Sequence, residues 1–178
     1  MGSYALCFAI GIGAWTLLEY VIHGVLSHQH RTVVSSLHQV HHGDPHAVFT
    51  SRAWLPVMVI VLAVVGFFGF RPGTFAMLGL VTGFIGYEVL HYRIHFARPR
   101  NRFETYLRTR HLAHHAFSPD AIFGVTNSLW DRVLGTEPAP SRQQEMKLAV
   151  EKIPALTGPS NWKRAVTIYL GTPRASIR

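Results

Sequence analysis

The chain has 178 residues, of which 48% are hydrophobic and only 15% are charged. A soluble domain usually carries about 25% charged residues, so this composition argues against an ordinary soluble protein and favours a single membrane domain. The formal net charge of +8 does not indicate a nucleic-acid-binding protein, because the basic residues lie beside apolar segments rather than on a polar domain.

Three long apolar runs occupy residues 4–25, 53–70 and 74–90. The first run contains one charged residue, Glu19, the second contains none, and the third contains Glu88. Each run is close to the roughly 20 residues that a membrane-spanning helix needs. We therefore expect an all-α integral membrane protein with about three transmembrane helices.

The segment Arg71-Pro72-Gly73 separates the second run from the third. Proline and glycine suit a tight turn and disfavour a helix interior, so we expect the two spans to form an antiparallel hairpin. If all three runs cross the membrane, Arg71 lies on one side and the other 16 of the 17 Lys and Arg residues lie on the opposite side. Excess positive charge marks the cytoplasmic side. The N-terminus is therefore expected outside.

Beyond the third run the chain becomes polar and basic. We expect a helix over residues 104–117 and a further helical stretch near residues 143–152. Residues 1–137 are predicted to form the membrane-embedded domain, and residues 138–178 are predicted to form a polar cytoplasmic tail.

Histidine is unusually frequent, because the chain contains 12 and ten of them fall into four clusters. The clusters are His23 and His28 (HxxxxH), His38, His41 and His42 (HxxHH), His91 and His95 (HxxxH), and His111, His114 and His115 (HxxHH). On a helix, residues three and four apart share one face, so three of the clusters aim their imidazoles together. The first pair is five apart, roughly 140° around a regular helix, and converges only where the helix ends or bends.

The predicted topology brings all four clusters to the cytoplasmic face, where they form a histidine-rich cap. Ten imidazoles are too many for one metal ion, whereas two ions with four or five ligands each would use them all. Neutral imidazole suits zinc, iron, copper and nickel, and redox-active iron is the choice for oxygen chemistry. His30 and His46 lie outside the clusters and are expected to be ordinary polar residues.

Two carboxylates inside the apolar runs are expected to support the site, because an intramembrane charge is costly and usually functional. Glu19 precedes His23 by four residues, and Glu88 precedes His91 by three. Each carboxylate is predicted to accept the free ring N–H of its histidine and so fix the tautomer. Asp131 and Asp44 are weaker candidates for the same role.

The order and spacing of these motifs resemble the fatty acid hydroxylase and sterol desaturase superfamily, most closely its fatty acid 2-hydroxylase branch. The resemblance covers roughly residues 10–138. The stretches that carry it are residues 15–23 (WTLLEYVIH), residues 86–95 (GYEVLHYRIH), the cluster at residues 111–115, and residues 123–131 (FGVTNSLWD).

This resemblance implies a membrane oxygenase that uses O2 and two electrons to hydroxylate a lipid acyl chain at a pair of iron ions, for which zinc can substitute in purified protein. All ten clustered histidines carry over as metal ligands. No cytochrome b5 domain accompanies these motifs, so we expect a separate electron donor, either cytochrome b5-like or of the ferredoxin type with its reductase. The arginines between Arg98 and Arg110 are expected to lie near the polar head of the lipid.

Three alternatives are to be distinguished at this stage. Another hydroxylase of the superfamily, acting on a carotenoid ring or a lipid head group, would share the HxxHH motifs. A membrane metal transporter is disfavoured, because the histidines gather at one face instead of following a path across the bilayer. A structural membrane protein with histidine-rich loops would tolerate alanine at His41 or His114.

Overall fold

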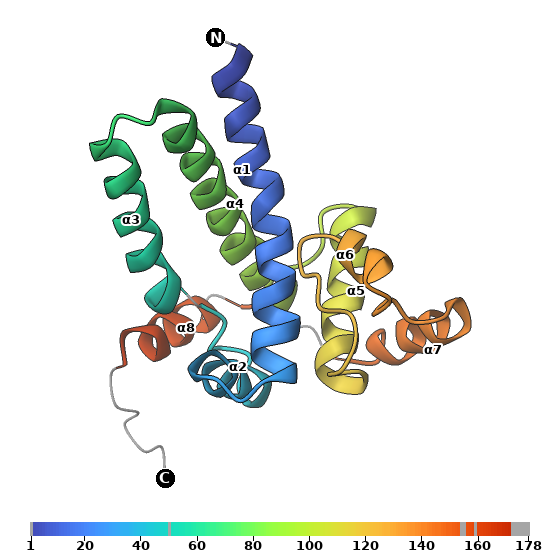
Figure 1. The fold of residues 1–178 in the computed structure, drawn as a ribbon. Helices are drawn as coiled ribbons and strands as arrows, with labels where there is room; N and C mark the ends of the chain where they lie inside the picture. Colours follow the sequence, from blue (N-terminus) through green and yellow to red (C-terminus); the bar gives the residue numbers. More distant parts are fainter. Residues whose placement is uncertain (1, 50, 154–155, 159, 172–178) are drawn as a thin grey trace.

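The computed structural model describes residues 2–49, 51–153, 156–158 and 160–171 (Figure 1). Its elements in chain order are α1 (Gly2–Tyr20), the π-helix η1 (Val21–Gln29), α2 (Val33–Gly43), α3 (Ser51–Phe67), α4 (Arg71–Phe96), α5 (Arg102–Phe117), α6 (Leu129–Val133), α7 (Pro140–Val150) and α8 (Ser160–Leu170). These described residues contain no strand, which confirms the predicted all-α class.

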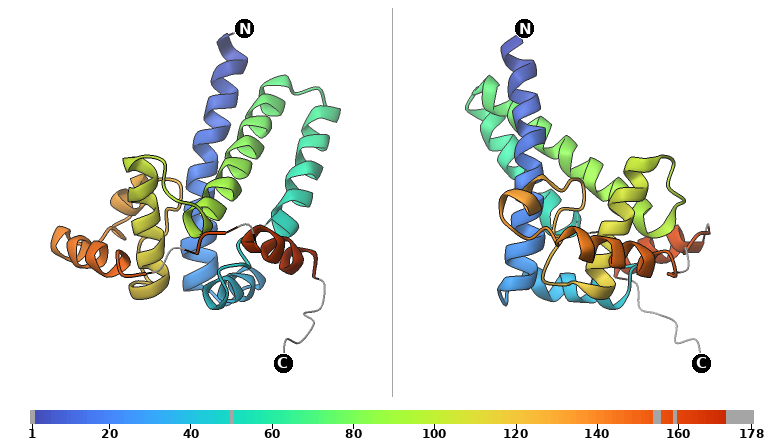
Figure 2. Two further views of the ribbon diagram at one scale, coloured as in Figure 1. Left: turned by 180° about the vertical axis from the view of Figure 1, so that it is seen from behind. Right: turned by 90° about the vertical axis from the view of Figure 1, so that its right-hand side faces the viewer.

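Two continuous helices are long and apolar enough to cross a membrane. One is α1 together with η1, which spans Gly2–Gln29 and has 28 residues, and the other is α4, which has 26. The helix α3 is also apolar but has only 17 residues. The three helices stand side by side and project from the remainder of the molecule (Figures 1 and 2).

The turn between α3 and α4 lies three residues earlier than predicted. Residues 68–70 form it, and Gly69 adopts a left-handed conformation with φ 69° that glycine tolerates best. Arg71, Pro72 and Gly73 instead begin α4, with the proline in the first turn. Proline is favoured there because the first N–H groups of a helix have no intrahelical partner and its fixed φ is already helical.

Glycines allow α1 and α4 to approach closely. A Cβ on Gly11 would overlap the backbone carbonyl of Ala76, and a Cβ on Gly79 would overlap that of Phe8. Small residues permit this kind of close helix contact in membrane proteins. Backbone atoms cannot yield as a side chain can, so the two helices depend on these positions.

Replacing Gly11 with alanine should therefore force α1 and α4 apart and destabilise the fold by about 1–3 kcal/mol, the usual cost of overpacking. Thermal unfolding in detergent measures the effect. Gly13→Ala is a matched control on the same helix, because nothing lies within 4 Å of a Cβ there. Equal stability of the two variants would contradict the close contact.

The other helices gather around the lower end of the three long helices. Helix α2 lies below α1, α8 lies across the foot of α3, and α5 stands beside the lower half of α1 (Figures 1 and 2). Helix α7 packs on α5 through a core that contains Leu112, Ile122, Met146 and Val150. The residues after 138 therefore include two packed helices, and the domain boundary at residue 138 stays a prediction.

Candidate metal centre

The ten clustered histidines lie in two groups of five. The first group is His23, His28, His38, His42 and His114, and the second is His41, His91, His95, His111 and His115. One ring nitrogen of each member lies within 4.8 Å of those of the other members of its group. Segments as far apart in the chain as η1 and α5 thus place their imidazoles around two common points.

The spacing within each HxxHH motif links the two groups. In α2, His38 and His42 join the first group and His41 joins the second. In α5, His111 and His115 join the second group and His114 joins the first. Residues i and i+4 point nearly the same way on a helix, while residue i+3 is turned about 100° from i+4. Each helix therefore contributes to both groups.

The first pair converges because the helix changes type. Residues 21–29 form a π-helix, in which each N–H bonds to the carbonyl five residues earlier, so His23 and His28 stand about one turn apart on one face. Their ring centroids lie 5.5 Å apart. The hydroxyl of Ser27 donates to the carbonyl of Ile22, also five residues earlier, at 2.7 Å. The five-residue spacing of His23 and His28 required a departure from regular α-helix, and the π-helix is that departure.

The second histidine motif lies on a helix, α2, which agrees with its HxxHH spacing. Thr32 caps α2, because its hydroxyl accepts a hydrogen bond from the N–H of Ser35. In return, the Ser35 hydroxyl accepts a hydrogen bond from the N–H of Thr32. Such a reciprocal capping box satisfies N–H groups that a helix start leaves unpaired. It explains why an 11-residue helix forms here.

The ring nitrogens meet in a way that hydrogen bonding cannot satisfy. In the second group, Nε2 of His111 lies 2.9 Å from Nε2 of both His91 and His95, and 3.0 Å from that of His115. One nitrogen carries at most one proton, so three such contacts leave lone pairs facing one another. A cation between them would replace this repulsion with coordination. The donor set therefore fits a metal ion.

The first group has the same character. Nε2 of His38 lies 2.9 Å from Nε2 of both His28 and His42, and Nε2 of His114 lies 3.1 Å from that of His28. The buried Nε2 of His23 has no hydrogen-bond partner among the described residues. Five imidazoles per group meet the number of ligands expected for each of two metals.

Burial favours the neutral form of the imidazoles on α2 and α5. Burial, reinforced by repulsion from neighbouring histidines, holds the pKa of His41, His111 and His114 well below the ordinary value. The same causes lower the pKa of His38 to about 2 and that of His42 to about 4. A neutral imidazole is the form that binds a metal, so these rings need not lose a proton to become ligands.

A loop between α5 and α6 orients two histidines of the first group. Nδ1 of His23 lies 2.5 Å from the carbonyl oxygen of Phe123, and Nδ1 of His114 lies 2.8 Å from that of Ala121. A carbonyl can only accept, so each Nδ1 carries the proton and donates it. The proton-free Nε2 atoms then face the group, as ligands would.

Glu19 supports His23 through this loop and not by the direct contact that was predicted. Its carboxylate accepts hydrogen bonds from the backbone N–H of Val125 at 2.5 Å and of Thr126 at 2.8 Å, and from the Thr126 hydroxyl. The carbonyl of Phe123, two residues before Val125, binds the His23 ring in its place. The four-residue spacing correctly indicated that Glu19 and His23 are connected. It did not show that the backbone of residues 123–126 lies between them.

Asp131 secures the other side of the same loop. Its fully buried carboxylate accepts from the N–H of Phe123 at 2.8 Å and of Gly124 at 3.0 Å, and from the Thr136 hydroxyl at 2.7 Å. Arg110 forms an ion pair with Asp131 and with Glu137, at 2.7 Å in each case. Asp131 therefore acts on the histidines through the loop backbone.

Two further carboxylates, Glu88 and Asp44, were candidates for orienting the histidines. Glu88 is buried on α4, and its predicted contact with His91 stays a prediction. Asp44 lies outside both groups, where it accepts from His46 at 3.0 Å and pairs with Arg164 at 3.1 Å. His30 is exposed, and His46 also lies outside the two groups, as expected for both.

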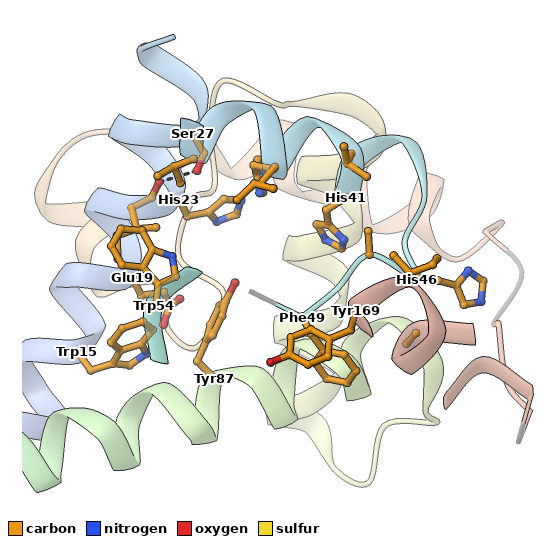
Figure 3. A pocket seen from close by; sticks show the side chains of 18 residues that line it. Trp15, Glu19, His23, Ser27, His41, His46, Phe49, Trp54, Tyr87 and Tyr169 are labelled. Carbon is orange, nitrogen blue, oxygen red and sulfur yellow. Dashed lines mark hydrogen bonds between the residues drawn. The ribbon is translucent and has the colours of Figure 1, made fainter. Parts of the chain in front are cut away.

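A mainly apolar cavity of about 260 Å³ opens beside both groups (Figure 3). His23 and His38 of the first group and His41 of the second line it. Its other walls are largely aromatic and aliphatic, and they come from α1, η1, α2, α3, α4, α8 and the segment between α2 and α3; they include Trp15, Ile22, Leu37, Phe49, Trp54, Tyr87, Ile168 and Tyr169. An apolar cavity beside a few polar groups is the usual form of a small-molecule site.

The fatty acid hydroxylase family model matches residues 8–136, which include all ten histidines and the loop that binds them. The chain belongs to the fatty acid hydroxylase family. The resemblance inferred from the motifs is thereby confirmed. No solved structure shows significant similarity to the chain.

Several curated relatives share this family domain. A dihydroceramide fatty acyl 2-hydroxylase of Arabidopsis thaliana is 33% identical over 75% of this chain and 61% of its own length. A ceramide very long chain fatty acid hydroxylase of Schizosaccharomyces pombe is 30% identical, over 73% and 42% respectively. A fatty acid 2-hydroxylase of Mus musculus is 31% identical, over 70% and 37%. The chain thus spans less than two thirds of the length of these relatives.

Three contributors to the site were not identified from the sequence. The carbonyls of Ala121 and Phe123 carry no side-chain signal, although the similarity of residues 123–131 to the family marked the segment. Arg110 was expected to lie near the polar head of the lipid, but it is buried and paired with Asp131. Helix α8 was not predicted; Ala165, Ile168 and Tyr169, at positions i, i+3 and i+4, could have revealed its inward face.

Proposed function

We propose that this chain hydroxylates the acyl chain of a membrane lipid, with O2 and external electrons, at two iron ions held by the ten histidines. The observation that carries the proposal is the pair of five-histidine groups bordering one apolar cavity within a fatty acid hydroxylase domain. Iron bound at such a site supplies the activation of O2 that inserts one oxygen atom into a C–H bond. Zinc would fill the same nitrogen sites in purified protein without redox chemistry.

The chain's own residues bind and orient the substrate. The apolar walls hold the acyl chain and exclude water, while His23, His38 and His41 keep the oxidised carbon beside both metal groups. None of the described residues that line the cavity is lysine or arginine. An acyl chain in uncharged amide or ester linkage needs no charged partner from these walls. The names of the relatives support a ceramide-type amide and hydroxylation at carbon 2.

We also propose that α1 with η1, α3 and α4 span the membrane, with the N-terminus outside and the histidine groups on the cytoplasmic face. The distribution of Lys and Arg supports this orientation, because Arg71 alone lies at the far ends of the spans. Because α3 has only 17 residues, the turn at residues 68–70 would complete its passage through the membrane. Residues 1–137 would form this membrane domain and residues 138–178 a cytoplasmic extension that contributes α7 and α8.

Two electrons per cycle must come from a redox partner, since the reduction of O2 requires them. We propose a separate cytochrome b5-like or ferredoxin-type donor with its reductase. Supplying each donor in turn to the purified iron-loaded protein, and measuring hydroxylated lipid, identifies which one supports turnover.

Lipid profiling tests the proposed function. The chain is expressed in a lipid-producing host that supplies a competent reductase, and the host without the chain is the control. Mass spectrometry should show a gain of one oxygen on the acyl part of amide-linked lipids, with fragments that locate it at carbon 2. Unchanged acyl chains in the presence of folded, iron-loaded protein would refute the proposal, and oxygen on a head group would favour the head-group hydroxylases instead.

A further inference from the structure

The cavity has two chemically different ends. At one end, Trp15, Trp54 and Tyr87 from the three long helices gather, and the Trp15 and Tyr87 ring centroids lie 5.7 Å apart (Figure 3). At the other end, Phe49 meets Tyr169 of α8, with ring centroids 6.1 Å apart. The histidines that line the cavity lie along its side between the two ends, as Figure 3 shows for His23 and His41.

The first end is the membrane end. Trp15 lies eight residues before His23, which places it about 12 Å further along the helix toward the apolar span. Trp54 lies on α3 and Tyr87 on α4, so all of these rings belong to the long helices. This end can therefore receive hydrocarbon.

The second end is closed by α8. Ala165, Ile168 and Tyr169 line the cavity, and Ala165 is fully buried in a cluster with Val48 and Phe96. Trp162 on the same helix is 54% exposed. A helix with one apolar face and a polar opposite face, lying across the foot of the spans, is typical of the membrane interface, where lipid head groups reside (Figures 1 and 2).

Polar contacts hold α8 in place. The ring of His46 bridges Asp44 and Asn161, at 3.0 Å from each, and Arg164 pairs with Asp44 at 3.1 Å. These contacts join α8 to the segment that follows α2. Helix α2 itself carries three of the ten clustered histidines. The α8 end of the cavity therefore has His46 and its polar partners at its rim, whereas the Glu19 carboxylate at the other end is already hydrogen-bonded to Val125 and Thr126.

We propose that α8 is the head-group selector of the enzyme: the lipid head lies against Ile168 and Tyr169, and the acyl chain runs past the histidines toward Trp15 and Trp54. The inference rests on the proposed acyl hydroxylation. Carbon 2 is adjacent to the linkage, so the head group must lie within a few bonds of the oxidised carbon. Only one end of the cavity can then hold the head, and the interfacial, polar-rimmed end matches it.

Photo-crosslinking of the full chain in bilayers tests this placement without turnover. Two probes are used, both amide-linked acyl lipids, one with a diazirine in the head group and the other with a diazirine at the acyl terminus. The head-group probe should label residues 160–170, and the acyl-terminal probe should label α1 or α3. The reverse pattern, or labelling of α8 by both probes alike, would overturn the inference.

The variant Ile168→Trp narrows the α8 end and should reduce head-group labelling by about tenfold, as steric changes in apolar pockets do. Lys163→Ala, on the exposed face of α8, is the matched control and should label like the wild type. Unreduced labelling of folded Ile168→Trp protein would count against selection by α8. Correct labelling without any hydroxylated product would instead reject the proposed function and leave the placement of α8 standing.

Discussion

Replacing His111 with glutamine should lower the metal content from about two ions to about one per chain and reduce lipid hydroxylation more than about 100-fold. Nε2 of His111 lies at the centre of the second group, within 3.0 Å of the nitrogens of three other histidines. Loss of a mere partner of a ligand costs 10–100-fold, so loss of a central ligand should cost more. Elemental analysis and lipid mass spectrometry measure the two effects.

His30→Gln is the matched control for this replacement, because His30 is an exposed histidine outside both groups. It should retain both metals and full activity. Thermal unfolding shows whether each variant is folded. If folded His111→Gln protein kept two metals, or kept its activity, His111 would not be a ligand and the proposed second site would be wrong.

Replacing Asp131 with alanine should destabilise the protein by about 3 kcal/mol. The substitution breaks the buried ion pair with Arg110 and removes the acceptor for the N–H groups of Phe123 and Gly124. Breaking a buried pair by removing one partner typically costs about 3–5 kcal/mol. In a chain of this size that corresponds to a fall in melting temperature of roughly 6–12 °C, measured by thermal unfolding in detergent.

Glu145→Ala provides the comparison, since Glu145 forms an exposed ion pair with Arg142. Its melting temperature should stay close to that of the wild type, because surface substitutions usually change stability by less than about 0.5 kcal/mol. Asp131→Ala protein should also lose metal from the first group before the second, since its loop orients His23 and His114. A wild-type melting temperature for Asp131→Ala would show that the loop is held by other contacts.

The predictions that succeeded rest on local periodicity. The lengths of the apolar runs predicted helices in all three places, and the HxxHH spacing predicted that imidazoles would converge. Both signals follow from helix geometry, which the neighbours of a residue in the chain determine. The division of the ten rings into two groups also follows from this geometry once α2 and α5 face each other.

The failures concern contacts between distant segments. No local pattern in the chain shows that Glu19 would bind the backbone 106 residues away, or that this loop would hold His23. The turn before α4 was misplaced because Pro72 is equally compatible with a turn and with the first turn of a helix. Helix α8 has a short inward face among polar residues, and only its packing over the cavity makes its role visible.

The metal content of the purified full chain tests the central claim most directly. Protein produced with iron and extracted gently should contain two metal ions per chain by elemental analysis, and a chelator that removes them should abolish hydroxylation until iron is restored. Folded, monodisperse protein that contains no metal, and that does not take up iron when it is supplied, would contradict the account.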